Sequence, residues 1–434
     1  MEFKRHIDNK LAEFKRQTHA KPQVIFGVRQ CGKTTAVLNH AKLYKNHIYI
    51  NFEMDLLMQH FFANTDLNPE EMIETISLLK RVPFYGEDTL IIFDEIQISN
   101  RALTSLKYFY ESTNSYKIIA LGSLLGAKIQ REKFSFPVGK IDIHYMYPLT
   151  FFEYLMATDN EQFIPIIEKA FAKNKLADVI HQQILQMFDT YIQIGGMPEA
   201  VVKFIESKDY GQVQTVHRNL QDGYLADMVK YSNNDQSTKI LHVYNNLALQ
   251  IGKENQKFML KHLERGATMR KYEGAIDWLI AANMGIKVGK VSKNIAPLAT
   301  HVEVNQFKLF LHDVGMLNSQ QQYIINESLA DDRIYLGIIM ENYAAMELTH
   351  NFPKLYYYDD NSKEVDYLLN CQNNIIVPLE IKASNNVKSK SLKIFMEQNN
   401  TKLAVRASRR NFGFDGIIKS IPLYAIGLLD EKLS

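Results

Sequence analysis

A short segment containing glycine and lysine, GVRQCGKTT at residues 27–35, constrains the fold of this chain most strongly. The apolar run VIF precedes it and AVLNHAKLY follows it, as expected where a β-strand passes into an α-helix. Its spacing is G-x-x-x-x-G-K-[ST], the Walker A pattern. In such a loop, backbone N–H groups surround phosphate oxygens, and the helix adds the positive end of its dipole. The sequence therefore predicts an α/β fold that binds a phosphate group.

The chemistry of this loop assigns roles to its residues. Lys33 is expected to reach the β- and γ-phosphates of ATP, and Thr34 to supply a hydroxyl ligand to Mg²⁺. Cys31 can be interpreted in two ways. Its thiol could be a site whose oxidation blocks nucleotide binding, or it could simply be a small residue that the loop tolerates. The residues predicted to bind nucleotide are Gly27, Val28, Arg29, Gln30, Cys31, Gly32, Lys33, Thr34 and Thr35.

A second motif, TLIIFDEIQ at residues 89–97, has the Walker B pattern. Its apolar residues predict a buried parallel strand, and Asp94 and Glu95 emerge at the carboxyl end, where open α/β sheets bind ligands. Asp94 is the predicted magnesium ligand, and Glu95 is predicted to polarise the attacking water. After a third apolar run, Ser123 is a candidate to contact the γ-phosphate or that water.

The length of 434 residues exceeds one ordinary core and predicts two to four domains, with 46% hydrophobic residues available to bury. Two cysteines, Cys31 and Cys371, exclude a disulfide framework and lack metal-site spacing. The charged start MEFKRHIDNK and the lack of a long apolar run predict a cytoplasmic protein without a membrane segment.

The net charge of +2 is unevenly distributed along the chain. Residues 253–293 hold nine Lys or Arg against four Asp or Glu, net +5, and residues 381–420 hold nine against two, net +7. The remainder therefore carries 2 − 12 = −10. Two basic segments favour a nucleic-acid partner, DNA before RNA, although basic residues that merely solvate exposed faces give the same count.

The order of patterns predicts four regions. Alternating strands and helices over 1–155 predict a P-loop core with a parallel sheet, and the helical pattern over 156–235 predicts a lid. Three helices and two strands over 236–305 predict a winged helix, with Arg270 and Lys271 facing outward toward DNA. A packing module between domains is the other interpretation of this region. Residues 306–434 form the last predicted domain.

That last region carries a second candidate site. A helical pattern bears Glu341, a strand bears Asp366, and a further strand bears Glu380 and Lys382, which are two residues apart and so share a face. Three carboxylates and a lysine that converge on divalent metal can activate water for phosphodiester cleavage. Glu341, Asp366 and Glu380 are therefore predicted metal ligands, and all four residues predicted catalytic groups.

Nearly end to end, the chain resembles the AAA-type ATPases of bacteria and archaea that carry a C-terminal domain of unknown function. The resemblance rests on GVRQCGKTT, IIFDEIQ, ALGSLLG, YPLTFFEYL, GGMPEAV, FKLFLHDVGML, GIIMENYAAMEL, EVDYLL and PLEIKAS, in that family's order. It implies an AAA-type core, a winged helix and a domain similar to the PD-(D/E)xK nucleases, whose metal-binding and catalytic positions correspond to Glu341, Asp366, Glu380 and Lys382.

One position departs from that family. Lys140 in VGKIDIHYMYPLT stands where the family commonly has an arginine, so Arg131 becomes the candidate arginine finger that would act across a subunit boundary of a homo-oligomer. The leading hypothesis is a magnesium-dependent ATPase coupled to a DNA-binding, nuclease-like C-terminal half. The rival hypothesis is a nucleotide-gated module that binds nucleic acid or protein without cutting it.

Overall fold

The computed structural model divides into two compact units. The first unit comprises residues 1–148 with 281–283, and the second comprises residues 149–280 with 284–434. The structure describes the chain apart from residues 1–2, 124–125, 127–136, 138, 231–233, 253–256, 324–332, 361–362, 385–389 and 434.

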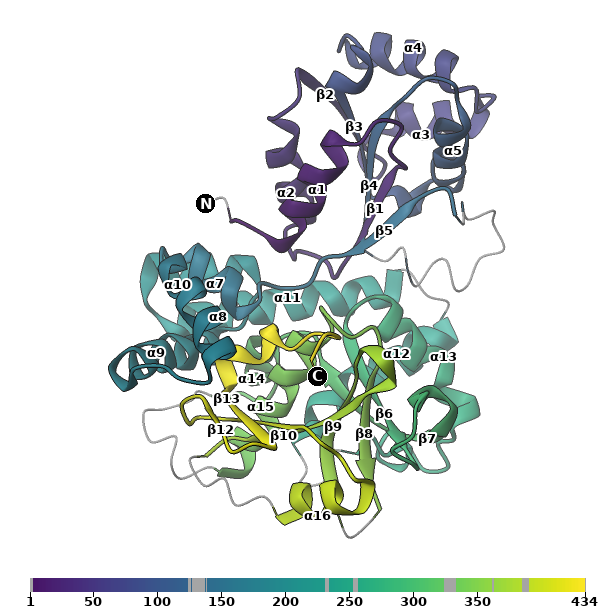
Figure 1. Cartoon of the computed structure of the whole chain (residues 1–434). Helices are drawn as coiled ribbons and strands as arrows, with labels where there is room; N and C mark the ends of the chain where they lie inside the picture. The colour runs from purple at the N-terminus through teal and green to yellow at the C-terminus, as the bar shows by residue number, and fades with distance from the viewer. Residues whose placement is uncertain are drawn as a thin grey trace. The chain divides into compact units, whose positions relative to one another are not determined.

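A five-stranded parallel sheet forms the centre of the first unit (Figure 1). Its strand order is β2-β3-β4-β1-β5, so β4 lies between the strand that precedes the Walker A loop and the strand that carries Asp94. The prediction of a parallel α/β sheet is confirmed. The strands are β1 (Gln23–Phe26), β2 (Asn46–Asn51), β3 (Thr89–Asp94), β4 (Lys117–Gly122) and β5 (Asp142–Tyr145).

Helices cover both faces of this sheet (Figure 1). α1 packs on α2, and α2 contacts β3 and β4, while α3 and α4 both pack against α5. Alternate strand residues such as Ile91 and Phe93 enter the core under α3, α4 and α5, and β3 is buried along its whole length, as its apolar sequence predicts. The helices are α1 (His6–Arg16), α2 (Lys33–Ala41), α3 (Leu56–Asn64), α4 (Pro69–Lys80) and α5 (Asn100–Glu111).

The second unit begins with a helical segment, as the pattern over 156–235 predicts. Arg409 makes a bidentate ion pair with Asp189, at 2.5 and 2.7 Å, and His181 contacts the Tyr424 hydroxyl at 2.9 Å. These helices therefore pack with the C-terminal strands, and the interpretation of 156–235 as a lid stays a prediction. The helices are α7 (Phe151–Ala157), α8 (Ile164–Lys173), α9 (Asp178–Ile194), α10 (Pro198–Ser207), α11 (Tyr210–Lys230), α12 (Asn234–Ile251) and α13 (Met269–Ala281).

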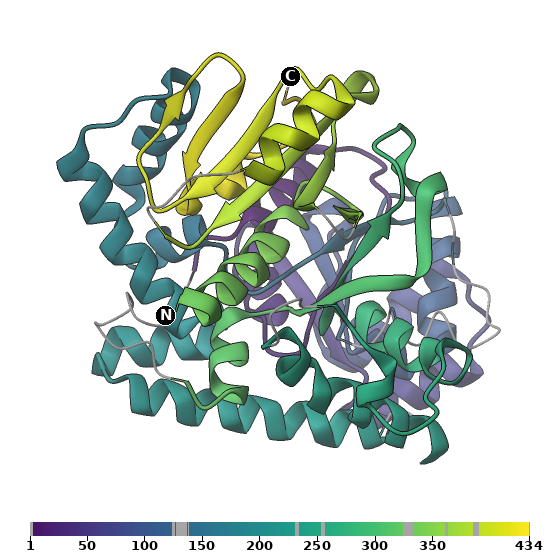
Figure 2. The same ribbon diagram turned by 90° about the horizontal axis from the view of Figure 1, so that it is seen from below.

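An eight-stranded mixed sheet of order β12-β13-β11-β10-β9-β8-β6-β7 fills the rest of this unit. α15 contacts β10, β6 and β7, while α16 contacts β9 (Figure 2). The strands are β6 (Gly285–Val291), β7 (Val302–Leu311), β8 (Leu355–Asp359), β9 (Glu364–Asn370), β10 (Ile376–Lys382), β11 (Ala404–Ser408), β12 (Gly413–Phe414) and β13 (Ile418–Pro422). The remaining helices are α14 (Val314–Gln320), α15 (Arg333–Leu348) and α16 (Lys390–Asn399).

This sheet corrects the winged-helix prediction. The two expected strands form as β6 and β7, but β6 also pairs in parallel with β8, so both belong to the C-terminal sheet. The boundary at 305 falls inside β7, and the expected second helix is a 3-10 turn, Leu260–His262. The alternation of apolar residues identified the strands correctly, yet alternation does not specify which sheet a strand joins.

Aromatic side chains and two buried carboxylates hold the second unit together. Phe151, Phe188 and Tyr424 belong to one group of ring contacts between the start of the unit and its C-terminal part. The carboxylate of Glu347 accepts the Phe151 N–H at 3.0 Å, and burial raises the pKa of Glu347 to about 7. Asp313 accepts the Gly196 N–H at 2.6 Å, so the GGMPEA turn is fixed by a residue 117 positions away.

Among the described residues, none of the helices has the length and apolar character required to cross a membrane.

Candidate functional site

The loop over residues 27–35 lies between β1 and α2, as predicted. Gly32 has φ 94°, a conformation that residues with a Cβ rarely adopt, and it precedes the first residue of α2. At Gly27 a Cβ would lie 2.1 Å from the Met146 carbonyl oxygen, so the backbone itself excludes any side chain there. Val28 and Cys31 are buried, Arg29 is partly buried, and Gln30 and Thr35 are exposed.

The ammonium group of Lys33 is turned onto its own loop. Nζ donates to the Gly27 and Val28 carbonyl oxygens at 2.9 and 2.8 Å, and the side chain is buried. These carbonyl oxygens are neutral, whereas a phosphate oxygen carries negative charge and would be the stronger acceptor for the ammonium group. An incoming phosphate would therefore compete with these two carbonyl groups for the lysine.

Thr34 and Asp94 bring the two motifs together. The Thr34 hydroxyl donates to Asp94 Oδ2 at 2.9 Å, and the Tyr49 hydroxyl donates to the same oxygen at 2.7 Å. A hydroxyl that donates its proton keeps its lone pairs, so Thr34 Oγ1 remains able to bind a cation. Hard oxygen donors of this kind suit Mg²⁺, which takes few protein ligands together with phosphate and water oxygens.

Glu95 follows directly and is held by two side chains. Gln97 Nε2 donates to Glu95 Oε2 at 2.5 Å, and the Ser123 hydroxyl donates to the same oxygen at 3.4 Å. The backbone of Glu95 is left-handed, with φ 51°, a conformation that costs free energy for a residue with a side chain. Ser123 immediately follows β4, so the sheet order brings the three predicted groups Asp94, Glu95 and Ser123 to one edge.

Arg5 was missed by sequence reasoning and supports this site. Its guanidinium donates to the Cys31 carbonyl at 2.8 Å and to the Tyr147 carbonyl at 2.6 Å, and the side chain is buried. Arg5 thereby ties the phosphate-binding loop to the chain that follows β5. A charged residue before the first helix offers no sequence pattern that would reveal this role.

The candidate arginine finger Arg131 lies outside the described residues. Lys140, which stands at the position of the family's arginine, forms an ion pair with Glu111 at 3.0 Å.

The second candidate site also assembles its predicted residues in one region. Glu341 lies on α15, Asp366 on β9, and Glu380 and Lys382 on β10. Lys382 Nζ lies 2.6 Å from Glu380 Oε1, which confirms that these two side chains share a face. Asp366 Oδ2 accepts the Ile381 N–H at 2.7 Å.

A lysine that sequence reasoning missed lies among these carboxylates. Lys308 on β7 is 2% exposed, and its Nζ lies 2.9 Å from Glu341 Oε2 and 2.6 Å from Glu364 Oε1. Burial lowers the pKa of Lys308, but the carboxylates of Glu341, Glu364 and Asp366 outweigh it, so the net shift is upward. Burial and the charge of Glu341 raise the pKa of Asp366 well above its ordinary value.

The predicted metal site at Glu341, Asp366 and Glu380 stays a prediction. In the part of the chain that the structure describes, no group of three or more His, Cys, Asp or Glu side chains is arranged to hold a metal ion. That part includes Glu341, Asp366 and Glu380. The ammonium of Lys308 supplies positive charge to Glu341 directly, and Lys382 supplies it to Glu380.

The two basic segments are partly neutralised by internal partners. In 381–420, Arg409 pairs with Asp189, and Lys419 donates to the Phe171 carbonyl at 2.8 Å. In 253–293, Lys271 pairs with Glu264. The exposed cations there include Lys261, Arg265 and Arg270, which lie on or near the start of α13.

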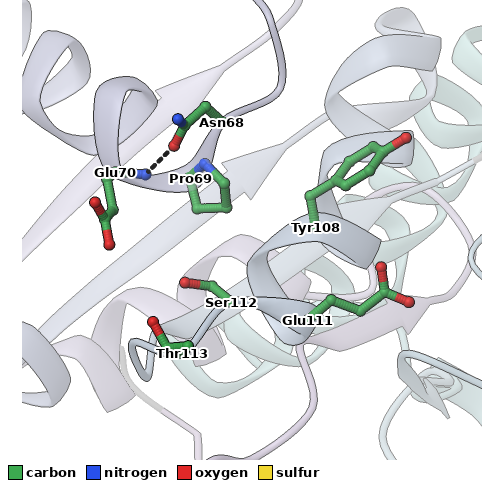
Figure 3. A pocket seen from close by; sticks show the side chains of 7 residues that line it. All are labelled: Asn68, Pro69, Glu70, Tyr108, Glu111, Ser112 and Thr113. Atoms are coloured by element: carbon green, nitrogen blue, oxygen red, sulfur yellow. Dashed lines mark hydrogen bonds between the residues drawn. The ribbon is translucent and has the colours of Figure 1, made fainter.

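A separate hollow of about 410 Å³ lies between the start of α4 and the end of α5 (Figure 3). Asn68 accepts the Glu70 N–H at 3.1 Å and begins α4 there. Asn114 donates to Glu70, and Lys140 pairs with Glu111, so both carboxylates of the hollow already have partners. None of its lining residues belongs to the Walker A or Walker B motif.

The geometry of the first site agrees with a comparison to known families. Residues 19–155 match the family described as an AAA domain. This part of the chain is similar to AAA domains and carries the P-loop motif. Two further matches, both described as domains of unknown function, cover residues 185–324 (DUF8612) and 336–426 (DUF4143), so the family comparison adds no function to the second unit.

Individual relatives are distant from this chain. An uncharacterized protein of Methanocaldococcus jannaschii is 29% identical over 190 residues, which are 41% of this chain and 38% of that protein. The matched part thus spans well under two thirds of that relative's length.

Two solved structures resemble the chain weakly. The Aeropyrum pernix ORC2 protein in ADPNP–ADP complexes is 11% identical, with a TM-score of 0.33 and coverage of 74% of this chain and 95% of that one. CDC6P from Pyrobaculum aerophilum is 11% identical, with a TM-score of 0.24 and coverage of 65% and 88%.

Proposed function

We propose that the AAA domain binds ATP with Mg²⁺ and hydrolyses it. The observation that carries the proposal is the 2.9 Å hydrogen bond from Thr34 to Asp94, which joins the Walker A and Walker B motifs in one site. Glu95 and Ser123 lie beside that pair, joined by a 3.4 Å hydrogen bond.

Each residue of this site has a separate role in the proposed hydrolysis. Lys33 exchanges its two loop carbonyls for phosphate oxygens, and the loop N–H groups and the start of α2 hold the remaining phosphate charge. Thr34 and Asp94 would hold Mg²⁺, which when bound supplies positive charge to the β- and γ-phosphates. Glu95 orients and polarises the attacking water, once its carboxylate leaves Gln97 and Ser123.

The test is the variant Glu95→Gln, which keeps the shape of the side chain and removes its negative charge. Turnover should fall by about two orders of magnitude or more, while binding of a fluorescent ATP analogue stays close to that of the wild type. Glu74→Gln on the exposed side of α4 is the matched control and should leave turnover unchanged. Equal turnover in Glu95→Gln and the control would remove Glu95 from the mechanism.

We further propose that the second unit binds nucleic acid without cutting it, and that the nucleotide state of the AAA domain controls this binding within a homo-oligomer. Support for binding comes from the exposed cations Lys261, Arg265 and Arg270. Support for the absence of cleavage comes from Lys308, whose ammonium pairs with Glu341, one of the three carboxylates predicted to hold metal.

Binding to duplex DNA should weaken steeply as salt rises, because each neutralised phosphate releases counterions. The double variant Arg270→Ala, Lys271→Ala should reduce the slope of log affinity against log salt by about two if both side chains contact phosphate. The absence of binding at low salt, or an affinity that does not change with salt concentration, would contradict the proposal. Divalent-metal-dependent cleavage that disappears in Asp366→Ala would restore the nuclease hypothesis.

A further inference from the structure

Tyr49 stands out among the residues around the nucleotide site because no predicted role accounts for it. It lies on β2, which pairs in parallel with β3, and in this register Tyr49 is opposite Ile92. Its hydroxyl reaches Asp94 Oδ2 at 2.7 Å, although the two residues are 45 positions apart. A phenol on a neighbouring strand therefore donates to the carboxylate of the Walker B motif.

The carboxylate of Asp94 is held at both oxygens. Oδ1 accepts the N–H of Glu95 at 2.9 Å, and Oδ2 accepts the hydroxyls of Thr34 and Tyr49. Of these donors, Thr34 is the one that must also act as a cation ligand. Tyr49 is a donor that a bound cation does not require, so it can keep Oδ2 in place throughout the reaction cycle.

The orientation of Tyr49 is itself supported. Asn51 Nδ2 donates to the Tyr49 hydroxyl oxygen at 3.4 Å, a long contact. The side-chain oxygen of Asn51 accepts the N–H groups of Glu53 and Met54, at 2.9 and 3.1 Å, so the turn after β2 fixes Asn51. A continuous set of hydrogen bonds thus runs from that turn through Tyr49 to Asp94.

We propose that Tyr49 is a positioning residue for Mg²⁺, and that it acts by holding the Asp94 carboxylate in the orientation that accepts the Thr34 hydroxyl. The inference rests on the proposed function of the AAA domain. Without the phenol, Oδ2 keeps a single donor, and the carboxylate gains rotational freedom that cation binding must then remove. A hydrogen bond to a charged group is strong enough to change an affinity by roughly tenfold.

The test uses Tyr49→Phe, which removes the hydroxyl and keeps the ring, with Tyr44→Phe as its matched control. Tyr44 is a buried tyrosine of the same unit, and its hydroxyl has no hydrogen-bond partner among the described residues. Binding of a fluorescent ATP analogue is titrated with Mg²⁺ and, separately, measured in excess chelator. This readout is independent of turnover.

In Tyr49→Phe, the Mg²⁺ concentration for half-maximal nucleotide binding should rise roughly tenfold, while affinity in chelator stays within about twofold of the wild type. Tyr44→Phe should match the wild type in both measurements. A Mg²⁺ midpoint unchanged in Tyr49→Phe overturns the role of Tyr49 and leaves the proposed function intact. An equal loss of affinity with Mg²⁺ and with chelator also overturns it, because that result indicates a general disturbance of the loop.

If the wild type binds the analogue without any dependence on Mg²⁺, the proposed function fails, and the role of Tyr49 fails with it.

Discussion

Replacement of Lys308 by methionine should destabilise the second unit strongly and in a pH-dependent way. Lys308 is 2% exposed, while its partners Glu341 and Glu364 are 15% and 35% exposed. Removal of one partner from a buried ion pair costs about 3–5 kcal/mol, because the remaining charge is left uncompensated. The lower end, about 3 kcal/mol, is expected here, since Glu364 is over a third exposed and water screens its share.

The pH dependence follows from Asp366, whose pKa burial and Glu341 already raise and which Lys308 partly restrains. Without the lysine, the pKa of Asp366 in the folded state should rise further above its value in the unfolded state. A group with a raised folded-state pKa contributes stability that is present at low pH and lost as pH rises. The free energy of unfolding that Lys308→Met loses relative to the wild type should therefore be larger at about pH 8 than at about pH 5.

The assay is urea unfolding followed by circular dichroism at these two pH values, with the transition of each unit fitted separately. The control is Lys239→Met, which removes the same charge from a pair with Asp235, whose side chain is 85% exposed, and should cost under about 0.5 kcal/mol. If Lys308→Met costs no more than this control, or costs the same at both pH values, Lys308 does not compensate buried negative charge.

Two further predictions concern the buried carboxylate of the second unit and the arginine behind the phosphate loop. Because burial raises the pKa of Glu347 from 4.5 to about 7, its contribution to stability is complete at low pH and is lost as pH rises through about 7. Glu347→Gln should remove this loss of stability at high pH, which is worth up to about 3 kcal/mol. Thermal unfolding of the wild type and the variant at about pH 5 and about pH 8 measures it. The same pH profile in both proteins would count against a buried, protonated Glu347. Arg5→Met should weaken ATP binding by roughly tenfold in a fluorescence titration, since the Cys31 carbonyl loses its charged donor, and an unaltered affinity would show that the loop holds its shape without Arg5.

The sequence indicated which residues of the first unit would lie together at the candidate nucleotide site, because the motifs that define this site are local in sequence. The loop from Gly27 to Thr35 and the pair Asp94–Glu95 each lie within a few residues, and the strand or helix beside each was visible as an apolar run. The supporting residues Tyr49, Arg5 and Gln97 follow no spacing rule, since each reaches its partner through the fold.

The second unit was harder to predict from the sequence, because its important contacts join residues that are far apart along the chain. Lys308 occurs as one charge within the apolar strand QFKLFL, which is a detectable exception, but nothing nearby in the sequence indicates that Glu341 and Glu364 neutralise it. The winged-helix prediction failed where strand pairing had to be inferred, because a pair of strands looks the same whether it stands alone or extends a larger sheet.

The contacts between α9 and the C-terminal strands also affect how this chain can fold. Asp189 and His181 find their partners 220 and 243 residues later, in Arg409 and Tyr424. Contacts between residues so distant in sequence form slowly, and during synthesis α9 emerges long before the strands that bury it. The AAA domain, by contrast, has nearly all of its sheet within the first 145 residues. Ribosome-bound chains should therefore present a folded P-loop unit followed by helices with an uncovered apolar face, the kind of surface that chaperones bind.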